Sequence, residues 1–179
     1  KSNPKPNQLN FNKNKIEIEF DEIIQVDKPT EKVIVSPAQK NMPQIQTSGR
    51  KVIVELQDSL IPNTTYTIDF SDAISDNNER NPLYNFSFSF ATGNSIDTLQ
   101  IGGVLLNAEN LEPVTGMLVG LHSNLNDSAF TKTPMQRIAK SDAYGRFSIK
   151  NIGAGTYRIY GLNDANRDYK FDNPSENIA

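Results

Sequence analysis

The stretch YNFSFSFATG, residues 84–93, decides the fold class of this chain. Ring-bearing side chains occupy every second position, and Asn or Ser lies between them; the rings are Tyr84, Phe86, Phe88 and Phe90. Side chains of a β-strand alternate between its two faces, so the pattern predicts a half-buried strand with one aromatic face. We interpret that face as core packing rather than as a platform for a ligand.

The same two-residue period recurs elsewhere in the first half, and polar turns separate the segments. It is clear in KIEIEF (15–20), KVIVEL (51–56) and TYTIDF (65–70), whereas SDNNERNP (75–82) has the composition of a turn. No segment has a convincing helical period. Short strands at even spacing, joined by polar turns, predict an antiparallel β-sandwich.

A second group of strands follows ATGNSID (91–97). Its expected strands are TLQIGGVLL (98–106), GMLVGLHS (116–123), AYGRFSIKNI (143–152) and GTYRIYGL (155–162). The sequence therefore predicts an all-β chain with two consecutive antiparallel β-sandwich domains. We assign residues 1–8 to a polar linker remnant, residues 9–94 to the first domain and residues 95–179 to the second, whose C-terminal end we expect to be truncated.

The composition excludes several classes of function. The chain has 179 residues and a formal charge of −3, without the basic stripe that nucleic-acid binding requires. It has no Cys, which excludes disulfides and thiolate metal sites, and a single His makes structural zinc untenable. No apolar run approaches the roughly 18 residues of a membrane-spanning helix.

The sequence also predicts no enzyme, no catalytic residue and no cofactor-binding residue. His122 is the only side chain that titrates near neutrality without perturbation. The strand pattern places it opposite Met117, Val119 and Leu121, facing solvent or a neighbouring sheet. The chain lacks a nucleophile elbow, and IGGV (101–104) lacks the spacing of a phosphate-binding loop.

The acidic stretch DANRDYKFDNPSE, residues 164–176, is the one candidate metal site. Calcium takes six to eight oxygen ligands, which a tight loop supplies from alternate positions. The candidate ligands are Asp164, Asn166, Asp168, the Lys170 carbonyl, Asp172 and Glu176. Calcium is accordingly the only cofactor that the sequence suggests.

The match to an EF-hand-like loop is incomplete. Tyr169 stands where a Gly normally makes the sharp turn, and Glu176 comes one position late. Arg167 and Lys170 also place two positive charges within the loop. The same residues fit a polar Asx-turn connection after a strand, and this interpretation is favoured over a calcium site.

Two family resemblances add to this interpretation. IEIEFDEII (16–24), VIVSP (33–37) and the long segment from KVIVEL to FSFSFATG (51–93) resemble the bacterial Ig-like domain of S-layer-type surface proteins. IGGVLLNAENLEPVTGMLVGL (101–121) and SDAYGRFSIKNIGAGTYRIYGLND (141–164) resemble the transthyretin-like, carboxypeptidase-regulatory type of domain. The pair in this order is similar to surface lipoproteins of Bacteroidetes-type bacteria.

The resemblance implies export to the cell envelope and attachment to the outer-membrane surface. The anchor would be a lipid on a Cys upstream in the precursor, and these families share no catalytic residues. Three triplets also resemble the Asp-(Ser/Thr)-apolar acceptor for O-glycosylation in that bacterial group, with Ser59, Thr98 and Ser128 as the acceptors. So short a pattern also arises by chance.

Three functions remain open at this point. A non-catalytic spacer module of an envelope lipoprotein ranks first, because it asks least of the residues. A surface module that binds a glycan or a protein partner ranks second, with Tyr144 and Tyr169 as its exposed aromatic candidates. An accessory part of an enzyme is a distant third.

Overall fold

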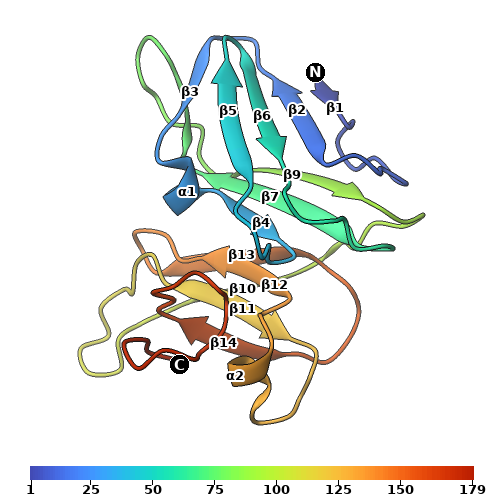
Figure 1. The fold of residues 1–179 in the computed structure, drawn as a ribbon. Helices are drawn as coiled ribbons and strands as arrows, with labels where there is room; N and C mark the ends of the chain where they lie inside the picture. The colour runs from blue at the N-terminus through green and yellow to red at the C-terminus, as the bar shows by residue number, and fades with distance from the viewer. The chain divides into compact units, whose positions relative to one another are not determined.

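The computed structural model describes residues 1–179 and confirms the all-β fold class (Figure 1). Each of the two helices, α1 (Pro29–Lys32) and α2 (Ala129–Lys132), is a single turn. The strands of the first half are β1 (Ser2–Asn3), β2 (Lys15–Glu19), β3 (Ile24–Val26), β4 (Ile34–Ser36), β5 (Gln44–Ser48), β6 (Lys51–Glu55), β7 (Thr65–Ser71), β8 (Ile74–Asp76) and β9 (Phe86–Ala91). Those of the second half are β10 (Leu99–Val104), β11 (Leu118–His122), β12 (Arg137–Lys140), β13 (Arg146–Ile152) and β14 (Arg158–Leu162).

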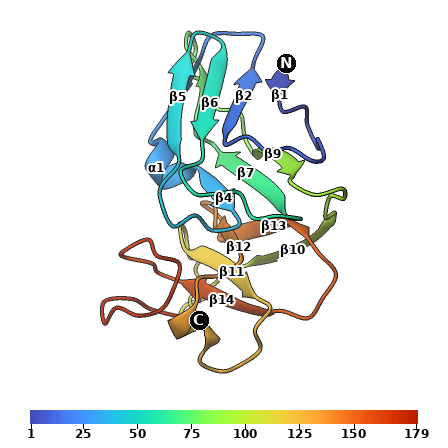
Figure 2. The same cartoon turned by 45° about the vertical axis from the view of Figure 1, so that its right-hand side comes forward.

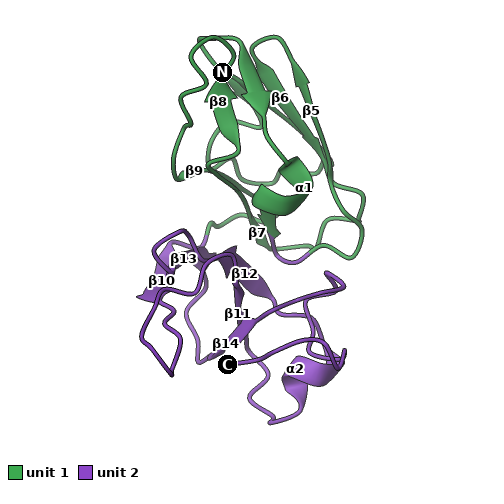
Figure 3. Cartoon of the chain, turned by 90° about the vertical axis from the view of Figure 1, so that its left-hand side faces the viewer, with its two compact units in different colours: residues 1–35, 39–96 green, residues 36–38, 97–179 purple.

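The chain forms two compact units, coloured separately in Figure 3. Unit 1 consists of Lys1–Val35 and Gln39–Ile96, and unit 2 consists of Ser36–Ala38 and Asp97–Ala179. The predicted division after residue 94 differs slightly from the observed division after Ile96. The assignment of Ser36–Ala38 to unit 2 has no signal in the sequence, because VIVSP has the pattern of one continuous strand end.

Unit 1 contains three sheets, most of whose strands can be followed in Figure 2. The strand orders are β1-β2-β6-β5, β4-β7-β9 and β3-β8. In the first sheet Ile16 lies opposite Val54 and Ile18 opposite Val52, so the alternating apolar residues of both strands share one face. All four side chains are buried. This is the packing that the two-residue period predicted.

The aromatic stretch that decided the fold class lies partly in this core. Phe88 and Phe90 of β9 are buried, and the Phe90 ring stacks on Tyr66 with a centroid distance of 5.3 Å. Phe86 is half-buried and packs against the same core. Tyr84 departs from the prediction: it precedes β9, beside Asn85 in the left-handed region, and is 68% exposed.

The N-terminal residues are not a linker, and the assignment of residues 1–8 was wrong. β1 pairs with β2, where Ser2 lies opposite Ile18. The chain then crosses to β9, where the Asn7 amide donates to the Ser89 carbonyl at 2.8 Å. Backbone pairing places these residues in unit 1, and a polar, Pro-containing composition conceals such pairing because the side chains contribute little to it.

Unit 2 contains a two-stranded sheet, β10-β13, and a three-stranded sheet, β12-β11-β14. Its core includes Val119 and Leu121 of β11, Ala139 of β12, and Ile149 and Ile152 of β13. The all-β nature of this unit agrees with the sequence. Its resemblance to a transthyretin-like domain stays a prediction.

The opposite face of β11 is also buried, which corrects the expectation for His122. His122 is 1% exposed, and the Tyr160 ring lies 6.1 Å from its ring. Phe130 of α2 contacts Tyr160 at 5.0 Å and Phe171 at 6.0 Å between ring centroids. The sequence did not predict the burial of His122 by these rings, because a one-turn helix and an irregular polar segment carry no periodic signal.

Neither of the two short helices has the length or the apolar composition needed to cross a membrane.

Candidate functional site

The acidic loop after β14 is folded around two of its own carboxylates. Asp164 lies two residues after the end of β14. It accepts the Arg167 amide at 2.7 Å through Oδ1 and the Tyr169 amide at 3.0 Å through Oδ2. Arg167 and Tyr169 both have φ near +63°. Asp164 therefore holds a tight turn in which two non-glycine residues adopt a left-handed conformation.

Glu176 closes the loop from its far end. Its side chain is buried, and Oε1 accepts the Ala165 amide at 3.2 Å. Oε2 accepts the amides of Asp172 and Asn173, each at 3.2 Å. A buried carboxylate with three backbone donors is well satisfied, so Glu176 joins the two ends of the loop through these hydrogen bonds.

The cation nearest to the remaining acids is a side chain of the loop itself. The Lys170 ammonium lies 3.0 Å from Asp168 Oδ2 and 3.1 Å from Asp172 Oδ2. Hydrogen bonds from these two carboxylates raise the pKa of Lys170, and the bond from Lys170 is the main cause that lowers the pKa of Asp172. The sequence assigned Lys170 a role through its carbonyl, whereas its ammonium pairs with two of the candidate ligands.

The surroundings of Asp164, which include other acidic side chains of the loop, raise its pKa. Burial is the main cause that raises its pKa, and repulsion from Glu176 and Asp168 raises it further, while the amides of Tyr169 and Arg167 oppose the rise. A divalent cation would remove that repulsion. As placed in the structure, however, the candidate ligands do not form a group of three or more acidic or His side chains around a common point. Calcium binding stays a prediction.

The three candidate glycosylation residues share an exposed position outside regular structure. Ser59, Thr98 and Ser128 lie in connecting segments, and each is exposed. The neighbouring Asp58 accepts the amides of Lys40 and Asn41 at 2.6 and 3.1 Å, so it fixes a turn beside the first acceptor. Glycosylation at these positions stays a prediction.

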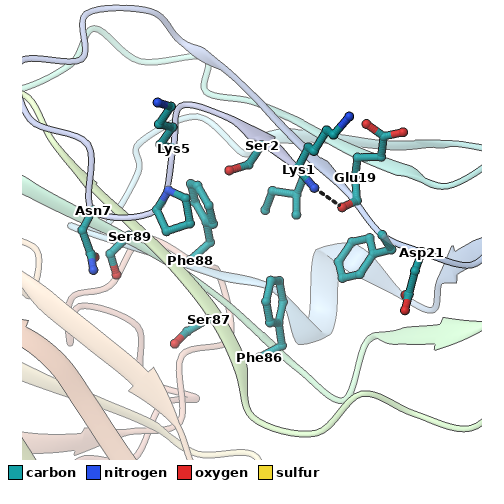
Figure 4. A pocket seen from close by; sticks show the side chains of 13 residues that line it. Lys1, Ser2, Lys5, Asn7, Glu19, Asp21, Phe86, Ser87, Phe88 and Ser89 are labelled. Carbon is teal, nitrogen blue, oxygen red and sulfur yellow. Dashed lines mark hydrogen bonds between the residues drawn. The ribbon is translucent and has the colours of Figure 1, made fainter.

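A groove that the sequence did not predict lies in unit 1 between β2, the N-terminal residues and β9 (Figure 4). Its volume is about 1070 Å³. Ile18, Phe20, Phe86 and Phe88 supply its apolar surface, and the rings of Phe20 and Phe86 meet edge-on at 5.5 Å. Its polar lining residues are Lys1, Ser2, Lys5, Asn7, Glu19, Asp21, Ser87 and Ser89. The groove was missed because its wall is the segment interpreted as a linker.

A smaller hollow of about 610 Å³ lies beside the loop that follows β8. Its most prominent acid, Asp76, accepts four backbone amides at 2.5–3.2 Å, from Asn78, Glu79, Arg80 and Asn81. These bonds, with that from Glu79 the largest contribution, lower the pKa of Asp76. The carboxylate organises its own turn, as the composition of SDNNERNP predicted.

His122 lines neither of these two hollows. Burial lowers the pKa of its imidazole, and a backbone hydrogen bond with Thr133 partly opposes that effect. Its Nε2 has no hydrogen-bond partner. A general base must reach the proton that it removes, and the aromatic cover over His122 prevents this.

The chain resembles several solved structures of bacterial surface proteins at low identity. It is 16% identical to the major pilin subunit of Bacillus cereus, with a TM-score of 0.28, and covers 57% of that chain. It is 12% identical to the N-terminal part of the bacterial S-layer protein SbsC, with a TM-score of 0.35, and covers 42% of it. It is 10% identical to the backbone pilin of serotype M6 Streptococcus pyogenes, with a TM-score of 0.29, and covers 40% of that chain. The alignments include 90%, 95% and 88% of the present chain, respectively.

Sequence comparison identifies the family. No curated protein matches the chain significantly. The profile of the bacterial Ig-like domain family matches residues 1–92, which is more than half of the chain and includes the N-terminal strand β1. The match extends almost to the end of unit 1 at Ile96. The chain therefore belongs to the bacterial Ig-like domain family.

Proposed function

We propose that this chain is a non-catalytic structural spacer of an exported bacterial cell-envelope protein. The observation that carries the proposal is that prominent carboxylates of the chain stabilise its own turns. Asp76, Asp164 and Glu176 all accept backbone amides of their own loops. Groups that fix turns serve shape and stability, which is what a spacer requires. Membership of the bacterial Ig-like family supports the same proposal.

The decisive experiment replaces residues 1–179 in the precursor with two unrelated β-sandwich domains of similar length. A spacer acts through its length and rigidity, so we expect the replaced precursor to keep its surface display and its cellular activity. Protease accessibility of the precursor on intact cells measures display. Loss of activity with display retained would contradict the spacer and favour binding by this chain.

We also propose that the precursor is anchored to the outer membrane through a lipidated Cys upstream of Lys1. The proposal rests on the resemblance to envelope lipoproteins. Metabolic labelling with a fatty-acid analogue tests it, with the upstream Cys replaced by Ala as the control. Absence of label on the unaltered precursor would contradict the lipid anchor and leave the spacer function untouched.

Binding of a glycan or protein partner is the second candidate, and the groove of unit 1 favours it. Its aromatic floor and polar rim combine the two kinds of contact that sugar recognition uses. The exposed Tyr144 is an alternative contact. NMR titration with a panel of soluble oligosaccharides tests the groove: amides of β9 should shift, and Lys5→Ala should weaken binding. Lys13→Ala, an exposed substitution outside the groove, is the matched control.

A further inference from the structure

Strand β10 is an unprotected sheet edge in unit 2. All six of its residues are exposed, including Leu99 and Val104 at 55% and 54%. β10 pairs only with β13 in its sheet. A two-stranded sheet is marginal on its own, and an exposed apolar edge is a template for a further strand.

The direction of the backbone groups on this edge follows from one hydrogen bond. The Leu105 amide donates to the Gly145 carbonyl on the β13 side at 2.8 Å. Backbone groups alternate along a strand, so those of Ile101 and Gly103 also point toward β13. The amide and carbonyl of Gly102 and Val104 therefore point away from β13, and neither residue bonds to any other part of the chain.

The usual protection of an edge strand is missing here. Residues 98–108 contain no charged side chain and no Pro. One irregularity in the β10–β13 register lies between Leu99 and Ile101, before the regular part of the edge. Natural edges are guarded by Lys, Pro or a bulge, so the unguarded part, Gly102–Val104, is available for pairing.

We propose that two copies of this chain pair antiparallel through β10, with Gly103 of each copy facing the other at a two-fold axis. The outward groups fix this register: Gly102 of one copy exchanges two hydrogen bonds with Val104 of the second, and the symmetric pair adds two more. Ile101 of one copy then lies opposite Leu105 of the other. The two sheets join as β13-β10-β10-β13.

The side chains of the edge suit a second copy of this chain. Gly103 lies at the closest approach of the two backbones and has no side chain to obstruct it. The Phe147 ring already lies 2.9 Å from where a Cβ on Gly103 would be. Ile101 is opposite the buried Ile149, and Leu105 packs against the unit 2 core, so each copy extends the apolar layer of the other. An uncharged edge brings no like charges together.

The register predicts a charge-swap experiment at Val104. The two Val104 side chains are diagonal neighbours across the axis, at a distance that long side chains can bridge. We expect sedimentation velocity to show that the unaltered chain dimerises at protein concentrations of up to about 1 mM. Val104→Lys and Val104→Glu should each raise the dimer Kd about tenfold or more by like-charge repulsion, and an equimolar mixture of the two should recover association.

Leu111→Lys and Leu111→Glu are the matched controls, because Leu111 is 70% exposed and lies outside the paired register. They should associate like the unaltered chain, and circular dichroism should give unchanged melting for all four variants. A monomeric unaltered chain up to about 1 mM would overturn the proposal, as would Val104 variants that dimerise normally. Failure of the mixture to recover association would overturn the register and with it the proposal.

Discussion

His122 is the residue whose environment differs most from its expected one. It lies on the face of β11 opposite the main core of unit 2, and α2 and the aromatic rings of Phe130 and Tyr160 lie over that face. Its cross-strand neighbour Arg158 is itself paired with Asp127. An imidazolium here would be buried and would gain no acceptor at Nε2, so the neutral form is the one that fits.

We predict that unit 2 loses stability as the pH falls below about 6.5, the ordinary pKa of His. The folded-state pKa is lowered, so between the two values the unfolded chain binds the proton more readily. The stabilisation from neutral His122 is therefore complete above pH 6.5 and decreases as the pH falls toward the folded-state pKa. Thermal melting of the unaltered chain and of His122→Phe at pH 7.5 and pH 5 measures the effect.

His122→Phe should show the smaller loss of melting temperature between the two pH values, and His122→Gln serves as a polar control that does not titrate. Equal losses in all three proteins would contradict the prediction, since the remaining acids are common to them. The sequence could identify His122 as the only neutral-pH titrating group. It could not predict the burial, because the covering segments are irregular.

At the scale of elements, strands with regular alternation were predictable and those formed by backbone pairing alone were not. β2, β6, β7 and β9 bury their apolar residues at alternate positions, which leaves a signal in the sequence. β1 consists of Ser2 and Asn3, and its role depends on amide and carbonyl groups that every residue has. The groove beside β1 was missed for the same reason.

Deletion of residues 1–8 should destabilise unit 1 by about 2 kcal/mol or more, because each of several lost backbone hydrogen bonds has a net contribution of about 1 kcal/mol. It should also uncover Phe88, which is only 4% exposed in the intact chain. Urea denaturation measures the change. Deletion of residues 1–3, which removes β1 but keeps the bonds from Asn7 and Gln8 to β9, should have a smaller effect. An unchanged midpoint after the full deletion would restore the linker assignment.

The acidic loop allows a test of calcium binding that does not depend on activity. If a calcium ion displaces Lys170 from Asp168 and Asp172, millimolar calcium should raise the melting temperature of unit 2 by mass action. Asp164→Ala combined with Asp168→Ala should abolish the rise. Asp142→Ala, in the turn before β13, is the control that should keep it. A melting curve unaffected by calcium would leave the loop as an Asx-turn connection.

At the scale of the whole molecule, the two apolar clusters share no residue. The cluster of unit 1 contains Tyr66, Phe70 and Phe90, and that of unit 2 contains Val119 and Leu121. Two cores of this kind were predictable, since both halves of the sequence alternate with period two. The crossing of Ser36–Ala38 into unit 2, where Ser36 Oγ accepts the Ile138 amide at 3.3 Å, was not. One polar contact between residues 102 positions apart leaves no pattern in a local window.

Separate cores predict separate unfolding. Differential scanning calorimetry of the full chain should resolve two transitions, and Phe90→Ala should lower only that of unit 1, by about 3–5 kcal/mol in stability. Leu121→Ala should lower only that of unit 2, by about 2–5 kcal/mol, because both side chains are fully buried in different clusters. Tyr84→Ala, at a position 68% exposed, should move neither. Because the two clusters share no residue, the double variant should show both shifts, each in its own transition. A single transition that moved with either substitution would mean that the two units unfold cooperatively. A spacer built from them would then lose both units in one unfolding step.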